Sequence, residues 1–189
     1  MVQLCKLVTD VRFDLDDYAR DDFFRAYTTD LSLLMAMKDF SLKQHIVENT
    51  LAGNSKGGIY ECAIADALYK KGYQIYFYKN DTTKREIDVI IQKDGSVVPI
   101  EVKSGNTRAN SLKWLMKNNK DISYGYKYVD GGIGVSKEGI IVRSNRGYMR
   151  SLLLHRHDND QVYIEKMQAT IPSIDIRKTC DLGKSIAGN

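Results

Sequence analysis

Residues 85–105 of this 189-residue chain, REIDVIIQKDGSVVPIEVKSG, carry its clearest structural signal. Runs rich in β-branched residues lie on both sides of Asp94-Gly95, which is typical of two strands joined by a tight turn. Both central positions of such a turn need positive φ, which the Asp-Gly pair tolerates. A two-residue loop pairs Lys93 with Ser96, and this pairing fixes which residues face each other along the hairpin.

The predicted register divides the side chains of the hairpin between two faces. One face is wholly apolar and is expected to be buried; it holds Ile87, Val89, Ile91, Val98, Ile100 and Val102. The other face is apolar near the turn and polar at the open end, where Glu86 faces Lys103. On that face Asp88 lies directly across from Glu101, with Cβ atoms roughly 5 Å apart. Two acids are therefore expected to face each other on neighbouring strands.

Opposed carboxylates are destabilising unless something neutralises them. A divalent cation with oxygen ligands would do so, and Mg²⁺ typically uses one or two carboxylates together with water and a substrate phosphate. The alternative is a surface ion network in which Lys103 and the nearby Glu86 balance the acids. On the hairpin alone, both interpretations stay open.

The rest of the chain predicts an α/β domain with a mixed sheet. Residues 59–71 predict a helix that is stopped by Gly72, and residues 111–119 predict an amphipathic helix. Residues 14–37 carry apolar side chains at mixed helical spacing and predict short helices. Aromatic and β-branched runs predict further strands at residues 73–80, 122–129 and 139–144.

Charge is unevenly distributed along the sequence. Residues 1–54 hold six Lys and Arg against nine Asp and Glu, whereas residues 101–150 hold ten against four. The basic part could face a polyanion, although ordinary solvated charge gives the same composition. The turn-rich AGNSKGG is the candidate boundary. We expect three parts: a small acidic helical adaptor at 1–54, an α/β domain at 55–165 and a loose tail at 166–189.

An acid followed on the next strand by Glu-x-Lys resembles the signature of the PD-(D/E)XK nuclease superfamily, here Asp88 and then Glu101-Val102-Lys103. Its members often carry a further Glu on the preceding helix, a position that Glu61 matches. Ile87 stands where many members have proline. About residues 10–130 are similar to the C-terminal domain of unknown function attached to many bacterial and archaeal AAA-type ATPases, through the ordered motifs DDYARDDFFRAYTTDLSLL, KGGIYECAIADAL, GYQIYFYKN, REIDVII, PIEVKSG and TRANSLKWL.

The resemblance implies a restriction-endonuclease-like mixed sheet flanked by helices, with a small N-terminal helical segment, the nuclease-like domain being residues 55–165. It also implies that Asp88, Glu101 and Glu61 bind Mg²⁺ or Mn²⁺ for phosphodiester hydrolysis. Lys103 would complete the catalytic set by orienting the attacking water or stabilising charge in the transition state.

A nucleic acid is the partner that this function requires. The basic helix carrying Lys113 and Lys117, together with Arg108, would hold its backbone without reading its sequence. The ATPase module of the similar family lies upstream, and this chain has no GxxxxGK[ST] phosphate loop, so we do not expect it to be that motor. The alternative function is a non-catalytic, nuclease-like module that binds nucleic acid or a partner protein and regulates an associated ATPase.

The remaining sequence features indicate a cytoplasmic protein. Cys5, Cys62 and Cys180 are odd in number, far apart and not arranged as CxxC, which favours a reducing compartment over disulfides or a cysteine-ligated zinc. No run of about 18 apolar residues is present, so we expect no membrane span. The acidic N-terminus does not resemble a signal peptide.

Overall fold

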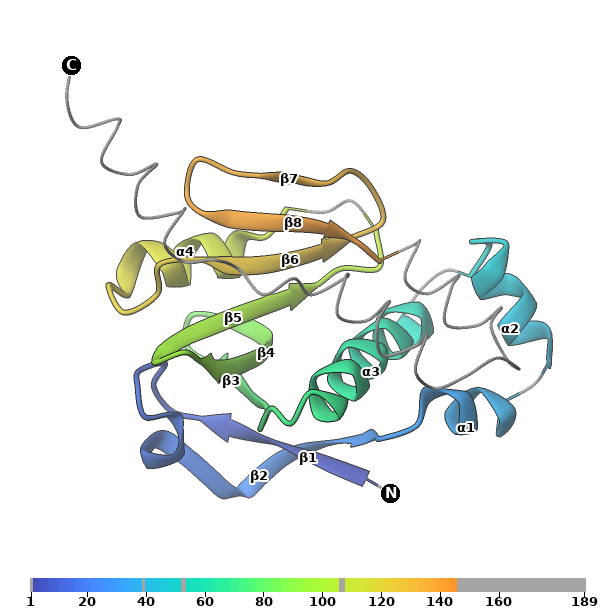
Figure 1. The fold of residues 1–189 in the computed structure, drawn as a ribbon, viewed down its shortest axis with the longest axis horizontal. Coiled ribbons are helices and arrows are strands. Elements are labelled where there is room, and N and C mark those ends of the chain that lie inside the picture. Colours follow the sequence, from blue (N-terminus) through green and yellow to red (C-terminus); the bar gives the residue numbers. More distant parts are fainter. Residues whose placement is uncertain (1, 39, 52–53, 106–107, 146–189) are drawn as a thin grey trace. The chain divides into compact units, whose positions relative to one another are not determined.

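Eight strands form one mixed sheet in the computed structural model, which describes residues 2–38, 40–51, 54–105 and 108–145 (Figure 1). The strands are β1 (Val2–Val8), β2 (Ala19–Thr28), β3 (Tyr76–Asn80), β4 (Arg85–Lys93), β5 (Ser96–Val102), β6 (Gly125–Val129), β7 (Gly134–Val135) and β8 (Ile140–Ser144). Their order in the sheet is β2-β1-β3-β4-β5-β6-β8-β7. The pairs β1–β3, β5–β6 and β6–β8 are parallel, and the other neighbours are antiparallel.

Four α-helices and one 3-10 helix occur in the described residues: η1 (Leu15–Tyr18), α1 (Leu31–Ala36), α2 (Phe40–Val47), α3 (Asn54–Lys70) and α4 (Asn110–Asn118). Helix α3 packs against β2 and β5, and α4 against β4 and β5. This arrangement confirms the predicted class, a mixed α/β fold. The predicted boundary at residue 165 and the predicted loose tail lie outside the described residues.

The β4–β5 hairpin has the predicted register. Lys93 pairs with Ser96, and the ladder continues to Val89 opposite Ile100. Asp94 and Gly95 adopt positive φ values of 51° and 74°, as the two-residue turn requires. The six residues of the predicted apolar face are each at most 5% exposed, and the turn end of the second face is buried as well. Burial on both sides is the pattern of central strands in a sheet that is covered on both faces.

The side-chain alternation of β4 is interrupted beside the predicted acid. Strand β3 pairs with β4 at Tyr76–Ile90 and at Tyr78–Ile87, with a register irregularity between these pairs. Ile87 consequently belongs to the same core cluster as Ile90, although the predicted alternation placed the two on opposite faces. An irregularity of this kind turns a strand locally and redirects its side chains. Asp88 lies inside this irregular segment.

The prediction of short helices across residues 14–37 was wrong for residues 19–28, which form β2. Strand β2 pairs with β1, and β1 pairs in parallel with β3, so the first 28 residues extend the main sheet. Residues 1–54 are therefore not a separate helical adaptor, although α1 and α2 do form within them. The aromatic sequence FFRAYT has strand propensity, and the segment pairs with β1 along most of its length, with Tyr27 as its buried residue.

Helix α3 begins at Asn54, well before the predicted start at residue 59, and therefore includes Gly57 and Gly58. Glycine within a helix is about 1 kcal/mol less favourable than alanine. Lys56 anchors this first part of the helix, because its Nζ donates to Asn49 Oδ1 at 2.6 Å and lies 3.5 Å from Asp130 Oδ2. Tertiary contacts thus outweigh the turn signal of the glycines.

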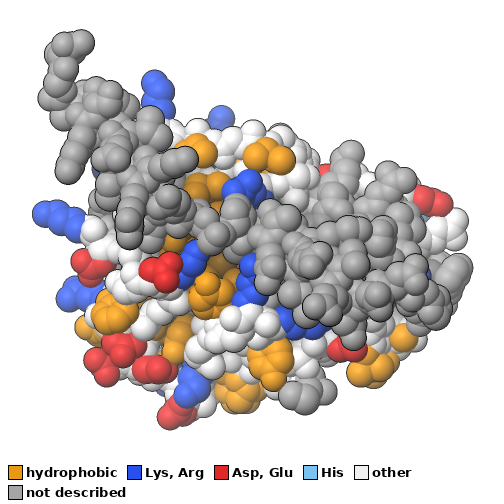
Figure 2. All heavy atoms as spheres, viewed as in Figure 1, with side chains coloured by type: hydrophobic (Ala, Val, Ile, Leu, Met, Phe, Trp, Pro, Cys, Tyr) orange, Lys and Arg blue, Asp and Glu red, His pale blue; other side chains and the backbone are white. Residues whose placement is uncertain are grey.

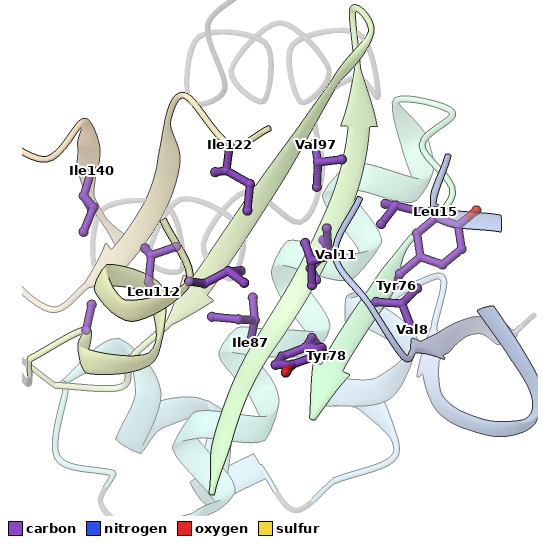
Figure 3. Close-up of a cluster of buried hydrophobic side chains, with 13 residues drawn as sticks. Val8, Val11, Leu15, Tyr76, Tyr78, Ile87, Val97, Leu112, Ile122 and Ile140 are labelled. Carbon is purple, nitrogen blue, oxygen red and sulfur yellow. The ribbon is translucent and has the colours of Figure 1, made fainter. Parts of the chain in front are cut away.

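A hydrophobic core fills the space between the sheet and α4 (Figure 3). Leu112 and Leu115 reach this core from α4, while Lys113 and Lys117 on the same helix are exposed, which confirms the predicted amphipathic helix. The other members of the core come from β1, β3, β4, β5, β8 and the connecting segments, including Val8, Val11, Leu15, Tyr76, Tyr78, Ile87, Ile90, Val97, Ile122 and Ile140. This packing fixes α4 beside the open end of the hairpin.

Candidate active site at the end of the β4–β5 hairpin

Asp88 and Glu101 lie just beyond the last pair of the β4–β5 ladder, Val89 with Ile100. Asp88 is 8% exposed, and its Oδ2 accepts a hydrogen bond of 2.7 Å from the backbone N–H of Val102. The Asp88 side chain thus accepts a hydrogen bond from the backbone of β5 beyond the last pair of the hairpin. The acid is part of the hairpin's own hydrogen bonding as well as of the polar cluster around it.

Glu101 is more deeply buried, at 2% exposure, and both of its carboxylate oxygens have partners. Oε1 lies 2.8 Å from Nζ of Lys103, and Oε2 accepts a bond of 3.3 Å from the backbone N–H of Leu112 in the first turn of α4. A carboxylate at this end of a helix is stabilised by the unpaired N–H groups there. The start of α4 therefore holds Glu101 in place.

Glu61 reaches the same region from α3. Its Oε2 accepts a hydrogen bond of 3.3 Å from the Tyr27 hydroxyl and lies 4.0 Å from Arg25 Nη1. Arg25 also forms an ion pair with Glu86, and Lys103 pairs with Glu101, so the structure does not show the alternative pairing of Glu86 with Lys103. Because α3 begins at Asn54, Glu61 lies outside the first turn of the helix. Its position is therefore not explained by attraction to the helix N-terminus.

The pKa values indicate that the four predicted site residues act on one another. Burial, followed by the charges of Glu61 and Glu101, raises the pKa of Asp88 to about 7, against the opposing effects of the Val102 N–H and Lys103. Burial also raises the pKa of Glu61, although Arg25 opposes the shift. Burial would lower the pKa of Lys103, but contact with Glu101 and the charges of Asp88 and Glu61 raise it overall. The structure thus brings the predicted residues into one electrostatic cluster, which we call the acid cluster: Glu61, Asp88, Glu101 and Lys103.

The donor set of the acid cluster fits a hard divalent cation in chemistry, because three carboxylates supply only oxygen ligands. Asp88 in addition bears the raised pKa of a carboxylate whose charge is insufficiently compensated. In the described part of the chain, however, no group of three or more His, Cys, Asp and Glu side chains has an arrangement ready to hold a metal ion. Binding would therefore require the side chains to move, starting with release of Glu101 from Lys103.

The predicted nucleic-acid contacts lie outside the acid cluster. Arg108 and Lys117 are exposed, and neither has a hydrogen bond or ion pair to it within the described residues. Lys113 pairs with Glu138 at 3.1 Å on the surface. The structure thus leaves these three residues accessible around α4 without joining them to the acids.

Arg25 and Tyr27 were not predicted as site residues. Both come from β2, the segment that was assigned to helices, and both contact Glu61. The signal that could have found them is the alternation in FRAYT, since Arg25 and Tyr27 must share a face if that segment is a strand. Exposed Phe24 and buried Tyr27 fit this reading.

Part of this chain matches a known protein family. Residues 56–148 match the family model of a domain of unknown function, DUF4143. No curated protein and no solved structure matches the chain. The matched segment holds most of α3 and all strands from β3 to β8, and with them the whole acid cluster. Strands β1 and β2 precede it, and β2 supplies Arg25 and Tyr27.

No helix in the described residues is long and apolar enough to span a membrane.

Proposed function

We propose that this chain is a PD-(D/E)XK-type nuclease domain that hydrolyses phosphodiester bonds in nucleic acid with Mg²⁺ or Mn²⁺. The observation that carries the proposal is the placement of Asp88, buried beside Glu61 and Glu101 and within the field of Lys103. Groups with strongly shifted pKa values in a cluster of titratable residues are candidates for a functional site. The mixed sheet and the position of the Glu-x-Lys sequence at the end of β5 support the restriction-endonuclease-like assignment.

In this proposal each residue has a distinct task. Asp88 and Glu101 hold the cation, and Glu61 completes its ligands or orients a bound water. The cation supplies Lewis-acid activation of water and of the scissile phosphate. Lys103 has a side chain that is 30% exposed, so it can leave Glu101 and donate to the phosphate as negative charge develops there. Arg108 and Lys117 hold the backbone of the nucleic acid by charge alone.

A second candidate function is a nuclease-like module that binds without cutting and regulates an associated AAA-type ATPase. The observation that favours it is the presence of protein cations beside the acids: Lys103 on Glu101, and Arg25 on Glu61 and Glu86. These pairs lower the need for a metal. Under this alternative the acid cluster stabilises the fold, and the exposed face of α4 carries the interaction.

Cleavage assays with labelled single- and double-stranded oligonucleotides distinguish the two functions. Wild-type protein is expected to cut in Mg²⁺ or Mn²⁺ and not in EDTA. Lys103→Met should reduce the rate roughly 10²-fold or more, because it removes a donor to the transition state. The matched control is Lys137→Met, since Lys137 is an exposed lysine with no role in the proposal. This control should cut at the wild-type rate.

Equal rates for the wild type and Lys103→Met would assign the cutting to a contaminant and favour the binding module. Calorimetry separates metal binding from turnover: the wild type should bind Mg²⁺ at millimolar concentration, and the Asp88→Asn, Glu101→Gln double variant should not. Absence of binding in the wild type would remove the metal from the proposal. Metal and oligonucleotide binding without cleavage would leave the non-catalytic module as the function.

A further inference from the structure

A row of tyrosines lies on the part of the sheet formed by β6 and β8. Tyr124, Tyr126 and Tyr128 alternate along the chain, so their side chains share one face. The rings of Tyr124 and Tyr126 meet edge to face with centroids 5.9 Å apart, and those of Tyr126 and Tyr128 are 6.4 Å apart. On the neighbouring parallel strand, Arg143 pairs with Tyr128 and therefore lies on the same face.

This face differs from the one that is packed on α4. Gly125 lies between Tyr124 and Tyr126, and a side chain there would lie 3.0 Å from Leu112 of α4. The tyrosines therefore point to the opposite side of the sheet, the side of α3. On that side hydrophobic, basic and acidic side chains are interspersed at the surface (Figure 2).

Three polar atoms of this row are buried without a hydrogen-bond partner: the hydroxyls of Tyr124 and Tyr126 and Nε of Arg143. Tyr126 is only 3% exposed. Arg143 has no ion pair in the part of the chain that the structure describes, and its charge acts on Tyr126, whereas the carboxylate of Asp94 acts on Tyr124. Three buried groups that can donate hydrogen bonds therefore lie on one face of the sheet, and none of the three atoms has a hydrogen-bond partner among the described residues.

Such a cluster is unfavourable unless an acceptor fills it. A buried donor without a partner costs about 1–3 kcal/mol, and most buried polar side-chain atoms in proteins are paired. Arginine and tyrosine hydroxyls are the donors that bind an oxyanion, since the guanidinium suits phosphate oxygens in particular.

We propose that Tyr124, Tyr126 and Arg143 form a phosphate-binding site on the α3 side of β6 and β8, separate from the acid cluster. Its ligand is a phosphate oxyanion, either free or as the phosphodiester of a nucleic acid. Hydroxyl and guanidinium donors satisfy the anion, and the anion neutralises Arg143. The site needs no metal and no cleavage chemistry, so it can be tested independently of the nuclease function.

The isosteric change Tyr126→Phe tests the site through two effects of opposite direction. The variant removes one buried donor without altering the packing of the ring. In phosphate-free buffer its thermal midpoint should rise above that of the wild type, because an unpaired group has been removed. Its affinity for inorganic phosphate should fall about tenfold or more, since a hydrogen bond to a charged group has been lost. Tyr69→Phe, at an exposed tyrosine, is the control and should change neither quantity.

Arg143→Gln provides a second variant, with Arg12→Gln at an exposed arginine as its control. Loss of the charge should weaken phosphate binding further than Tyr126→Phe does. Titrations in EDTA with inorganic phosphate and with a short single-stranded oligonucleotide distinguish the two sources of the anion. Competition between these ligands would assign the site to a nucleic-acid phosphodiester, and binding of phosphate alone would assign it to the free anion.

Two results would overturn the proposal. A lower midpoint for Tyr126→Phe in phosphate-free buffer would show that the hydroxyl already has a partner within the protein. Unchanged binding in both variants, or no binding of either ligand to the wild type at millimolar concentration, would show that the donors do not form an anion site.

Discussion

Replacing Asp88 with Asn should stabilise the metal-free protein, and the gain should depend on pH. Asparagine keeps an oxygen that can accept the Val102 N–H, but it carries no charge beside Glu61 and Glu101. The pKa of Asp88 is raised from 3.8 to about 7. Since one pKa unit corresponds to about 1.36 kcal/mol, the ionised side chain destabilises the fold by up to ~4 kcal/mol.

The direction of the pH dependence follows from which state binds the proton more tightly. Between pH 4 and 7 the folded protein keeps a proton on Asp88 that the unfolded chain has lost, so stability falls as pH rises through this range. Above pH 7 the loss is complete. The variant cannot titrate at this position and should match the wild type near pH 4. At pH 8 its melting temperature should be higher by roughly 10 °C.

The measurement is thermal and urea unfolding of both proteins in EDTA at pH 4, 6 and 8. Asp94→Asn is the matched control, because Asp94 lies in the turn of the same hairpin with a side chain that is 62% exposed. Added Mg²⁺ should reduce the difference at pH 8, because it stabilises only the wild type. A difference between the two proteins that is the same at every pH, or a less stable variant at pH 8, would show that the charge of Asp88 does not destabilise the fold.

The other predictions concern backbone conformation and the ion pairs of β2. Gly72→Ala should lower the free energy of unfolding by about 1 kcal/mol, because Gly72 has a φ of +80° and only the backbone is strained, with open space around the added methyl. Gly58→Ala should instead raise it by about 1 kcal/mol, since Gly58 lies inside α3 with nothing within 4 Å of an added Cβ; urea titrations that give both changes the same sign would contradict this contrast. Arg25→Gln should lower it by about 1–3 kcal/mol at pH 8 and by less at pH 4, because Glu61 and Glu86 lose their shared cation while ionised; an equal loss at both pH values would exclude the charge as the cause.

The hairpin could be predicted from the sequence because one local feature determines it. Asp94-Gly95 sets the turn, the turn sets the register, and the register places Asp88 near Glu101. What could not be predicted was the irregularity between β3 and β4, which depends on the pairing of β4 with a third strand. The predicted face of Ile87 was wrong for the same reason. The turn fixes the pairing of β4 with β5, but it contains no information about the pairing of β4 with β3.

The N-terminal strands could not be predicted because their stabilising contacts are distant in sequence. Only one neighbour of β1 in the sheet, β2, is close to it in sequence. Its other neighbour, β3, lies far along the chain, since Lys6 pairs with Tyr76. Arg25 and Tyr27 became site residues only through that pairing, which brings β2 near Glu61 on α3. Local patterns identified the acids of the matched domain, whereas the groups that surround them required the tertiary structure.

Because β1 pairs in parallel with β3, the ribosome makes β1 well before one of its two neighbours in the sheet. Gln3, in β1, donates its side-chain hydrogen bond to the carbonyl of Tyr73, which is 70 residues later in the chain. At about 5–20 residues per second, a ribosome needs roughly 4–14 s to synthesise that interval. During this time Cys5 and Val8, which are fully buried in the finished fold, have no β3 to cover them. A nascent chain of this protein therefore presents an incomplete sheet edge for seconds, which makes its first strands the expected point of chaperone contact during translation.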